Sequence, residues 1–73
     1  MEFDHSKLLG RIKEKFGSQD ALAEYMGWSP SALSNRVNNK IHFDTDEIIK
    51  LCDPSCLDIQ AEDIGLYFFT PKF

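Results

Sequence analysis

The two histidines and two cysteines of this 73-residue chain are the side chains that could ligate a metal or act as nucleophiles. They are His5, His42, Cys52 and Cys56. The cysteines are four positions apart, as on one helical turn, and the histidines are distant from them, which matches no ligand spacing of closed zinc sites. We therefore predict no metal site and no cofactor, and we expect both cysteines to act as small buried apolar groups, as in a reducing cytosol.

The segment Asp4-His5-Ser6 contains the three side-chain types of a hydrolase triad, but consecutively. A triad needs groups that converge from suitable backbone geometry, which adjacency in sequence does not supply. We also expect a small helical core to leave no room for a substrate pocket, which needs roughly 300 Å³ or more. We interpret these residues as a solvated capping segment and predict that the protein is not an enzyme.

A second set of polar residues is expected on an exposed helix face. If Leu33 and Val37 face the core, a rotation of about 100° per residue turns Asn35 outward. The short polar side chains beside it are Ser31, Ser34 and Asn38. Asparagine and serine can hydrogen-bond to base edges, yet no arginine or lysine occupies the outward centre. The face is therefore equally suited to a nucleic acid or to another protein.

Capping signals place this face in a helix-turn-helix at about residues 19–38. Ser18 is the expected N-cap of the first helix, and Gly27 supplies the backbone freedom that the turn needs. The second helix starts after the cap Ser29, with Pro30 at its first position. This motif serves to place one exposed helix in a groove, so it indicates a regulator.

The remaining segments predict three more helices. Apolar spacing predicts a helix at about residues 5–16 and a last one at about residues 60–68, followed by an aromatic tail within residues 66–73 that packs in part near Phe3. Asp44 is expected to cap the fourth helix. Its expected buried side comprises Ile48, Ile49, Leu51 and Cys52. The predicted fold is all-α, a compact five-helix domain that spans residues 1–73.

Charge is distributed unevenly along the chain, whose net charge is -4. Residues 1–40 carry six basic and five acidic side chains, net +1, and residues 41–73 carry two basic and seven acidic ones, net -5. A domain that binds DNA alone normally has surplus positive charge, so the acidity favours a basic protein partner. The candidate phosphate contacts are Lys7, Arg11, Lys15, Arg36 and Lys40.

The helix-turn-helix also carries a family resemblance. Gln19, Ala23, Gly27 and Leu33 stand at the first, fifth, ninth and fifteenth places of the pattern shared by phage repressors and Cro-like proteins. The wider matching segments are residues 3–12, 37–40, 47–52 and 63–70. The chain thus resembles small Cro-like regulators of temperate phages of Gram-positive bacteria, including modulator-of-repression antirepressors. That resemblance implies a lambda-repressor-like fold.

Two residues depart from the family pattern. Arg36 occupies the eighteenth place, which is usually aliphatic, so we expect Val37 to anchor the helix and Arg36 to lie at its flank or the helix to be slightly rotated. Trp28 occupies the tenth place, and we expect its indole to be mostly buried, with partial exposure beside the second helix of the motif as the alternative.

The resemblance implies two alternative functions. An antirepressor would bind the DNA-binding domain of the cognate lysogeny repressor and favour the lytic programme, and its acidity would suit that basic surface. A Cro-like repressor would instead dimerise and bind operator DNA directly. The candidate contacts for either partner are Gln19, Trp28, Ser29, Pro30, Ser31, Ser34, Asn35 and Asn38. Without an apolar run long enough for a bilayer, we expect a cytoplasmic protein of the bacterial host.

Overall fold

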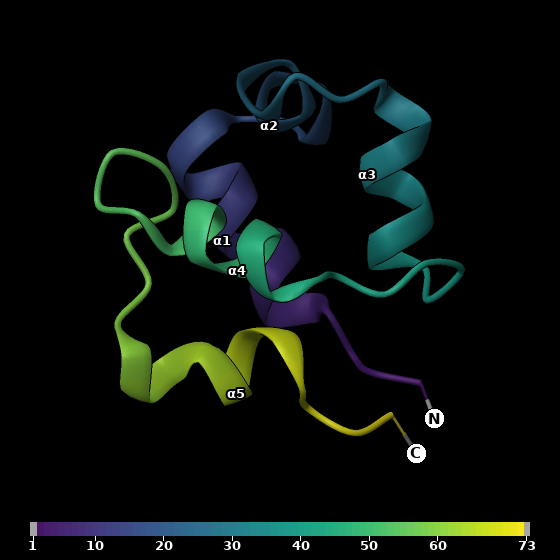
Figure 1. The fold of residues 1–73 in the computed structure, drawn as a ribbon, viewed down its shortest axis with the longest axis vertical. Coiled ribbons are helices and arrows are strands. Elements are labelled where there is room, and N and C mark those ends of the chain that lie inside the picture. The colour runs from purple at the N-terminus through teal and green to yellow at the C-terminus, as the bar shows by residue number, and fades with distance from the viewer. Residues whose placement is uncertain (1, 73) are drawn as a thin grey trace.

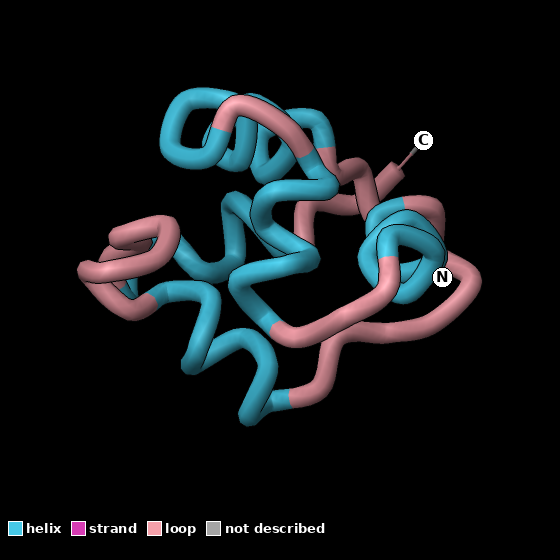
Figure 2. Tube along the Cα trace, turned by 90° about the horizontal axis from the view of Figure 1, so that it is seen from above, coloured by secondary structure: helices cyan, strands magenta, loops and turns pink. Residues whose placement is uncertain are grey.

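The computed structural model describes residues 2–72, and helices make up most of that range (Figures 1 and 2). The helices in chain order are α1 (Ser6–Phe16), α2 (Gln19–Met26), α3 (Pro30–Val37), α4 (Thr45–Cys52), the 3-10 helix η1 (Ala61–Asp63) and α5 (Ile64–Phe68). The predicted all-α fold with five α-helices is confirmed for this range. The only β-bridge among these residues joins Phe3 to Pro71.

Helix α1 forms where the sequence predicts it. Leu8 and Ile12, one turn apart, are both 1% exposed and turn the apolar face of the helix into the core. Asp4 Oδ1 accepts hydrogen bonds from the Ser6 backbone N–H and hydroxyl at 2.8 and 2.6 Å, which supports the first turn. The helix ends at Gly17, whose φ of 84° is a left-handed conformation that favours glycine.

The helix-turn-helix is confirmed, with the predicted caps in place. Ser18 Oγ accepts from the Ala21 N–H at 3.2 Å, and Ser29 Oγ accepts from the Ala32 N–H at 3.3 Å. Gly27 has a φ of 76° at the turn between the two helices. Leu33 is fully buried and anchors α3 against α2, so the opposite side of α3 is left on the outside of the domain, as Figure 1 shows.

Helix α4 starts with a capping box. Asp44 Oδ1 accepts from the Glu47 N–H at 2.8 Å, and Glu47 Oε1 accepts from the Asp44 N–H at 3.1 Å. The prediction that Ile49 is buried was wrong, because its side chain is 64% exposed. Ile48 and Leu51 face the core, and a rotation of about 100° from Ile48, away from Leu51, carries Ile49 out of the apolar face.

The loop after α4 adds core residues that the helical patterns did not predict. Leu57 is fully buried and Ile59 is 6% exposed. Cys56 is buried and Cys52 half-buried, which confirms the expected apolar role for Cys56 and, in part, for Cys52. Burial raises the pKa of both thiols. Among residues 2–72, no three potential ligand side chains lie together as a metal site.

The two ends of the described chain lie side by side (Figure 1). The Asp4 N–H donates to the Thr70 carbonyl at 2.7 Å, and the Phe3 and Phe69 rings meet edge to face with centroids 5.5 Å apart. The tail therefore packs near Phe3 as predicted. Phe73, also part of that prediction, lies outside the described residues.

His5 corrects the prediction of a solvated capping segment. Asp4 and Ser6 are exposed, but His5 is only 6% exposed and its Nδ1 lies 3.0 Å from the Val37 carbonyl oxygen. The imidazole is buried because it joins the start of α1 to the end of α3, a contact between residues 32 positions apart. None of the helices that the structure describes is long and apolar enough to span a bilayer.

Candidate partner-binding surface

Most of the predicted contact residues lie on α3 or in the turn before it. We call the outward side of α3, together with its two capping residues, the α3 surface. It consists of Ser29, Pro30, Ser31, Ser34, Asn35 and Asn38. Ser34 and Asn35 are half-buried and the other four are exposed. Gln19 is exposed at the start of α2, and Trp28 is half-buried beside the core. The indole of Trp28 thus packs against the core and keeps a partly exposed side, a position between the two expectations.

Hydrogen bonds within the α3 surface hold several of its side chains. Asn38 Nδ2 donates to the Ser34 carbonyl and hydroxyl oxygens at 2.9 and 3.2 Å, and the Ser29 and Ser31 hydroxyls lie 3.3 Å apart. The Asn35 carbonyl accepts from the N–H groups of Lys40 and Ile41 at 2.8 and 3.2 Å. These bonds preorganise the surface and fix the chain that follows α3.

Arg36 is bound internally through all three guanidinium nitrogens. Its Nε and Nη2 each donate to a carboxylate oxygen of Glu47 at 2.9 Å, and its Nη1 donates to the Ala32 carbonyl at 2.7 Å. The guanidinium also lies over the Trp28 ring, with its central carbon 4.3 Å from the ring centroid. The hydrogen bonds between the two side chains lower the pKa of Glu47 and raise that of Arg36. Arg36 thus lies at the flank of α3, and Val37 is buried as expected.

Arg11 also has internal partners. Its Nε and Nη2 donate to the carbonyls of Leu57 and Asp58 at 2.8 and 2.9 Å, and its Nη1 pairs with Glu14 at 2.6 Å. These bonds hold the loop after α4, where Asp58 has a φ of 52°. The arginine is therefore a structural anchor, whereas Lys7 and Lys15, the other two candidate phosphate contacts of α1, are exposed.

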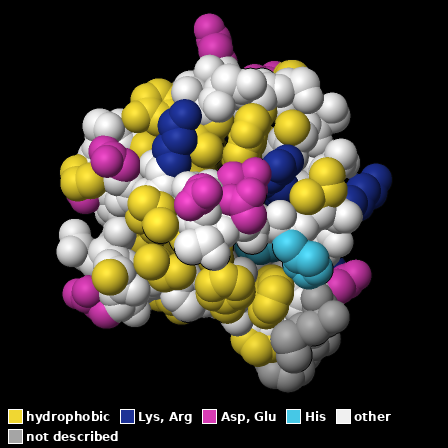
Figure 3. Space-filling model, viewed as in Figure 1, with side chains coloured by type: hydrophobic (Ala, Val, Ile, Leu, Met, Phe, Trp, Pro, Cys, Tyr) yellow, Lys and Arg dark blue, Asp and Glu magenta, His cyan; other side chains and the backbone are white. Residues whose placement is uncertain are grey.

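Only the lysines among the five candidate phosphate contacts remain exposed. They are Lys7, Lys15 and Lys40. On the face drawn in Figure 3, acidic and basic side chains lie beside one another among apolar ones, so no continuous basic area covers that face. The sequence prediction missed Glu47 as the partner that neutralises Arg36. The Asp44-x-x-Glu47 spacing of a capping box predicts the start of α4, but it does not point to Arg36.

Comparison with known proteins identifies relatives of this fold. Residues 1–71 match the family described as "Protein of unknown function (DUF739)". The chain belongs to this family. Among solved structures, the chain is similar to the modulator of repression (MOR) of the temperate bacteriophage TP901-1 from Lactococcus lactis, with 40% identity and a TM-score of 0.80. That match covers 94% of this chain and 90% of the phage protein.

No curated protein matches the chain. The solution structure of the phage protein nevertheless confirms the resemblance to small regulators of temperate phages, because it agrees in both sequence and fold over nearly the full length of each chain. The similarity includes the helix-turn-helix, since a match over 94% of the chain leaves few residues out.

Proposed function

We propose that this protein is a phage antirepressor that binds the DNA-binding domain of the cognate lysogeny repressor through its helix-turn-helix and thereby favours the lytic programme. The pairing of Arg36 with Glu47 is the observation that carries the proposal, because it leaves α3 without a free cation. The similarity to a protein named as a modulator of repression supports the same function. The site of action is the cytoplasm of the bacterial host.

Electrostatics supports a protein partner over a bare duplex. DNA binding gains much of its affinity from lysine and arginine contacts to phosphates, and Arg36 is the only basic residue of α3. The chain as a whole has a net charge of -4, which repels DNA. The DNA-contacting surface of a repressor is positive, so an acidic antirepressor is attracted to it and associates faster.

The α3 surface suits close packing against a protein. Its outward side chains are short and uncharged, so another helix can approach the backbone of α3 without burying an unpaired charge. Asn38 and Ser34 are already hydrogen-bonded to each other, so fixing them at an interface costs little further side-chain entropy.

A competition experiment tests this function. The purified protein is titrated into operator DNA, the repressor, and the repressor–operator complex at about 0.15 M salt. We expect the protein to bind the repressor and to remove it from DNA or join it there, without tight binding of its own to the operator. Tight, sequence-selective binding to the operator without affinity for the repressor would establish the Cro-like alternative.

Matched variants locate the interface. Asn35→Arg adds a positive side chain to the α3 surface and is expected to lower repressor affinity about tenfold or more, because it places a cation against a basic partner. Gln60→Arg makes the same charge change at an exposed position directly before η1, outside the α3 surface, and it should leave the affinity within about twofold. Equal repressor affinities of the two variants would exclude the α3 surface as the repressor-binding site.

A further inference from the structure

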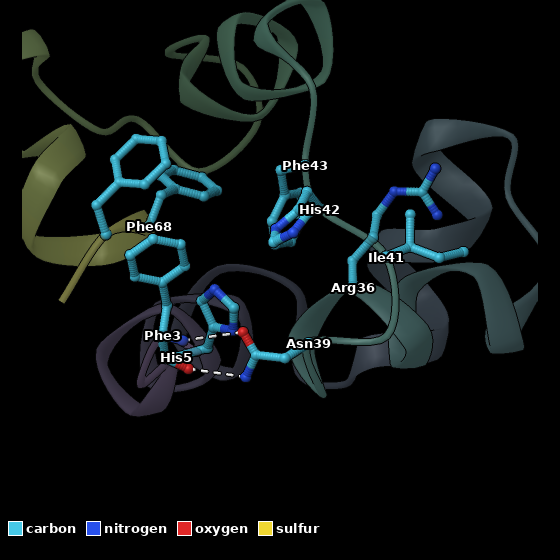
Figure 4. Close-up of a pocket in the computed structure, with 9 residues that line it drawn as sticks. Phe3, His5, Arg36, Asn39, Ile41, His42, Phe43 and Phe68 are labelled. Atoms are coloured by element: carbon cyan, nitrogen blue, oxygen red, sulfur yellow. Dashed lines mark hydrogen bonds between the residues drawn. The ribbon is translucent and has the colours of Figure 1, made fainter. Parts of the chain in front are cut away.

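A small pocket at the C-terminal end of α3 contains a hydrogen-bond acceptor that belongs to a largely buried side chain (Figure 4). It lies between the N-terminal segment, the chain that links α3 to α4, and the end of α5. The residues that matter here are His5, Asn39, Ile41, Phe43 and Phe69. The predicted function does not use this pocket.

The acceptor is Nε2 of His5. Nδ1 of the same ring lies 3.0 Å from the Val37 carbonyl oxygen, which can only accept, so Nδ1 carries the hydrogen and donates. In the neutral ring with that tautomer, Nε2 has a free lone pair. No residue between 2 and 72 donates to Nε2. Since no fully buried side-chain nitrogen or oxygen of these residues lacks a partner, Nε2 keeps a small solvent-accessible area although His5 as a whole is only 6% exposed. Figure 4 shows one edge of the imidazole turned toward the gap between Phe3 and Phe43.

The walls of the pocket are fixed by contacts between distant parts of the chain. The Asn39 side-chain amide makes two hydrogen bonds of 2.9 Å with the Phe3 backbone, drawn in Figure 4. Phe43 meets His5 edge to face at 5.7 Å between ring centroids, and meets Phe68 at 5.2 Å. The pocket is therefore preformed, which lowers the entropic cost of filling it.

The mouth of the pocket is mainly apolar and open to solvent, and the exposed His42 is a polar group in its lining. Ile41 is 44% exposed and Phe69 is 47% exposed, and both line it. Arg36, which also lines it, is neutralised by Glu47. The enclosed space is about 20 Å³, enough for one water-sized group at the bottom. A ligand that fits has one small hydrogen-bond donor at its tip and an apolar body that stays in the mouth.

We propose that this pocket binds a partner side chain with a terminal hydroxyl on an apolar body, of which tyrosine is the best match. The hydroxyl donates to His5 Nε2, and the ring contacts Ile41 and pairs with the aromatic ring of Phe69. The inference rests on the proposed function for its partner, the repressor. The Ile41 N–H bonds to the Asn35 carbonyl, which holds the mouth of the pocket beside the C-terminal end of α3.

Phenol and toluene test the pocket without the repressor. Both probes have the same ring, and only phenol has the donor. We expect phenol, titrated to about 20 mM, to shift the His5 Nε2 and Ile41 methyl NMR resonances in a saturable way, with an affinity at least about threefold above that of toluene. Equal shifts by the two probes, or no saturable shift because only water fills the site, would overturn the proposal.

Two isoleucine variants provide the control. Ile41→Ala should weaken phenol binding about threefold or more because it removes part of the mouth. Ile49→Ala makes the same truncation at an exposed position that does not line the pocket and should have no effect. If phenol binds as expected but Ile41→Ala leaves repressor affinity unchanged, the pocket is real and its assigned partner is wrong. If the unmodified protein does not bind the repressor at all, the proposed function is refuted.

Discussion

Substitution of Glu47 by glutamine tests the role of the Arg36–Glu47 pair. Glutamine keeps the side-chain carbonyl oxygen that completes the capping box of α4, so the start of the helix is preserved. It replaces the second carboxylate oxygen, which accepts from Arg36 Nη2 at 2.9 Å, with an amide nitrogen that cannot accept. The variant thus removes one charge and at least one hydrogen bond from the pair.

The expected cost follows from the geometry. A hydrogen bond to a charged group contributes about 1.5–3 kcal/mol and a neutral one about 0.5–1.5 kcal/mol. The two side chains are 14% and 18% exposed, so solvent weakens the pair only in part. We expect Glu47→Gln to lower the free energy of unfolding by about 1–3 kcal/mol, and each kcal/mol lowers the Tm by roughly 4–8 °C in a domain of this size.

The pH dependence distinguishes the ion pair from general destabilisation. The hydrogen bonds from Arg36 hold the pKa of folded Glu47 below its ordinary value of 4.5. The unfolded chain therefore binds the proton more tightly, so the pair stabilises the fold fully above the unfolded pKa and stops doing so as the pH falls through the folded pKa. The difference in stability between wild type and variant should be complete at pH 7 and shrink in the acid range.

Thermal unfolding followed by circular dichroism at pH 7 and pH 3 measures both effects. Glu24→Gln, at an exposed position on α2, removes one charge without a side-chain ion pair and is the control. The same loss of Tm in both variants at pH 7, or a Glu47→Gln effect that is undiminished at pH 3, would refute this account of Arg36. A freed Arg36 should also make the dependence of DNA binding on salt steeper, by about one phosphate contact.

Two further substitutions separate stability from partner binding. Arg11→Met should lower the free energy of unfolding by about 1–3 kcal/mol, since it leaves the carbonyls of Leu57 and Asp58 without their donor. Urea unfolding measures this change, and an unchanged stability would mean that Arg11 does not anchor the loop. Leu33→Ala should cost about 2–5 kcal/mol because Leu33 is fully buried. At a temperature where each variant is folded, repressor affinity should match wild type, and a specific loss with Arg11→Met would reassign that residue to the interface.

The features predicted correctly from sequence are those set by near neighbours. Ser18, Ser29 and Asp44 each cap a helix through a backbone N–H three positions later, so the pattern is visible in a short window. The buried positions of α2 and α3 follow from helical period in the same way. The prediction that Ile49 is buried was wrong only because the expected apolar face of α4 was too wide.

The candidate site was harder to predict because its arginines act over long separations. Arg36 pairs with a residue 11 positions away, and Arg11 bonds to carbonyls 46 and 47 positions away. An arginine that the sequence suggests as a phosphate contact can thus be hydrogen-bonded within the protein instead. Backbone carbonyls carry no residue type, so no pattern in the sequence could have pointed to Leu57 as the partner of Arg11.

The contact between the two ends of the described chain bears on how the protein could be re-engineered. The Lys72 N–H already donates to the Glu2 carbonyl at 3.1 Å, so a short peptide linker could join the ends into a closed ring. Cyclisation would reduce the conformational freedom of the unfolded polypeptide while leaving α3 untouched. A circular form should therefore resist heat and exopeptidases better than the linear one and still present the same helix to its partner.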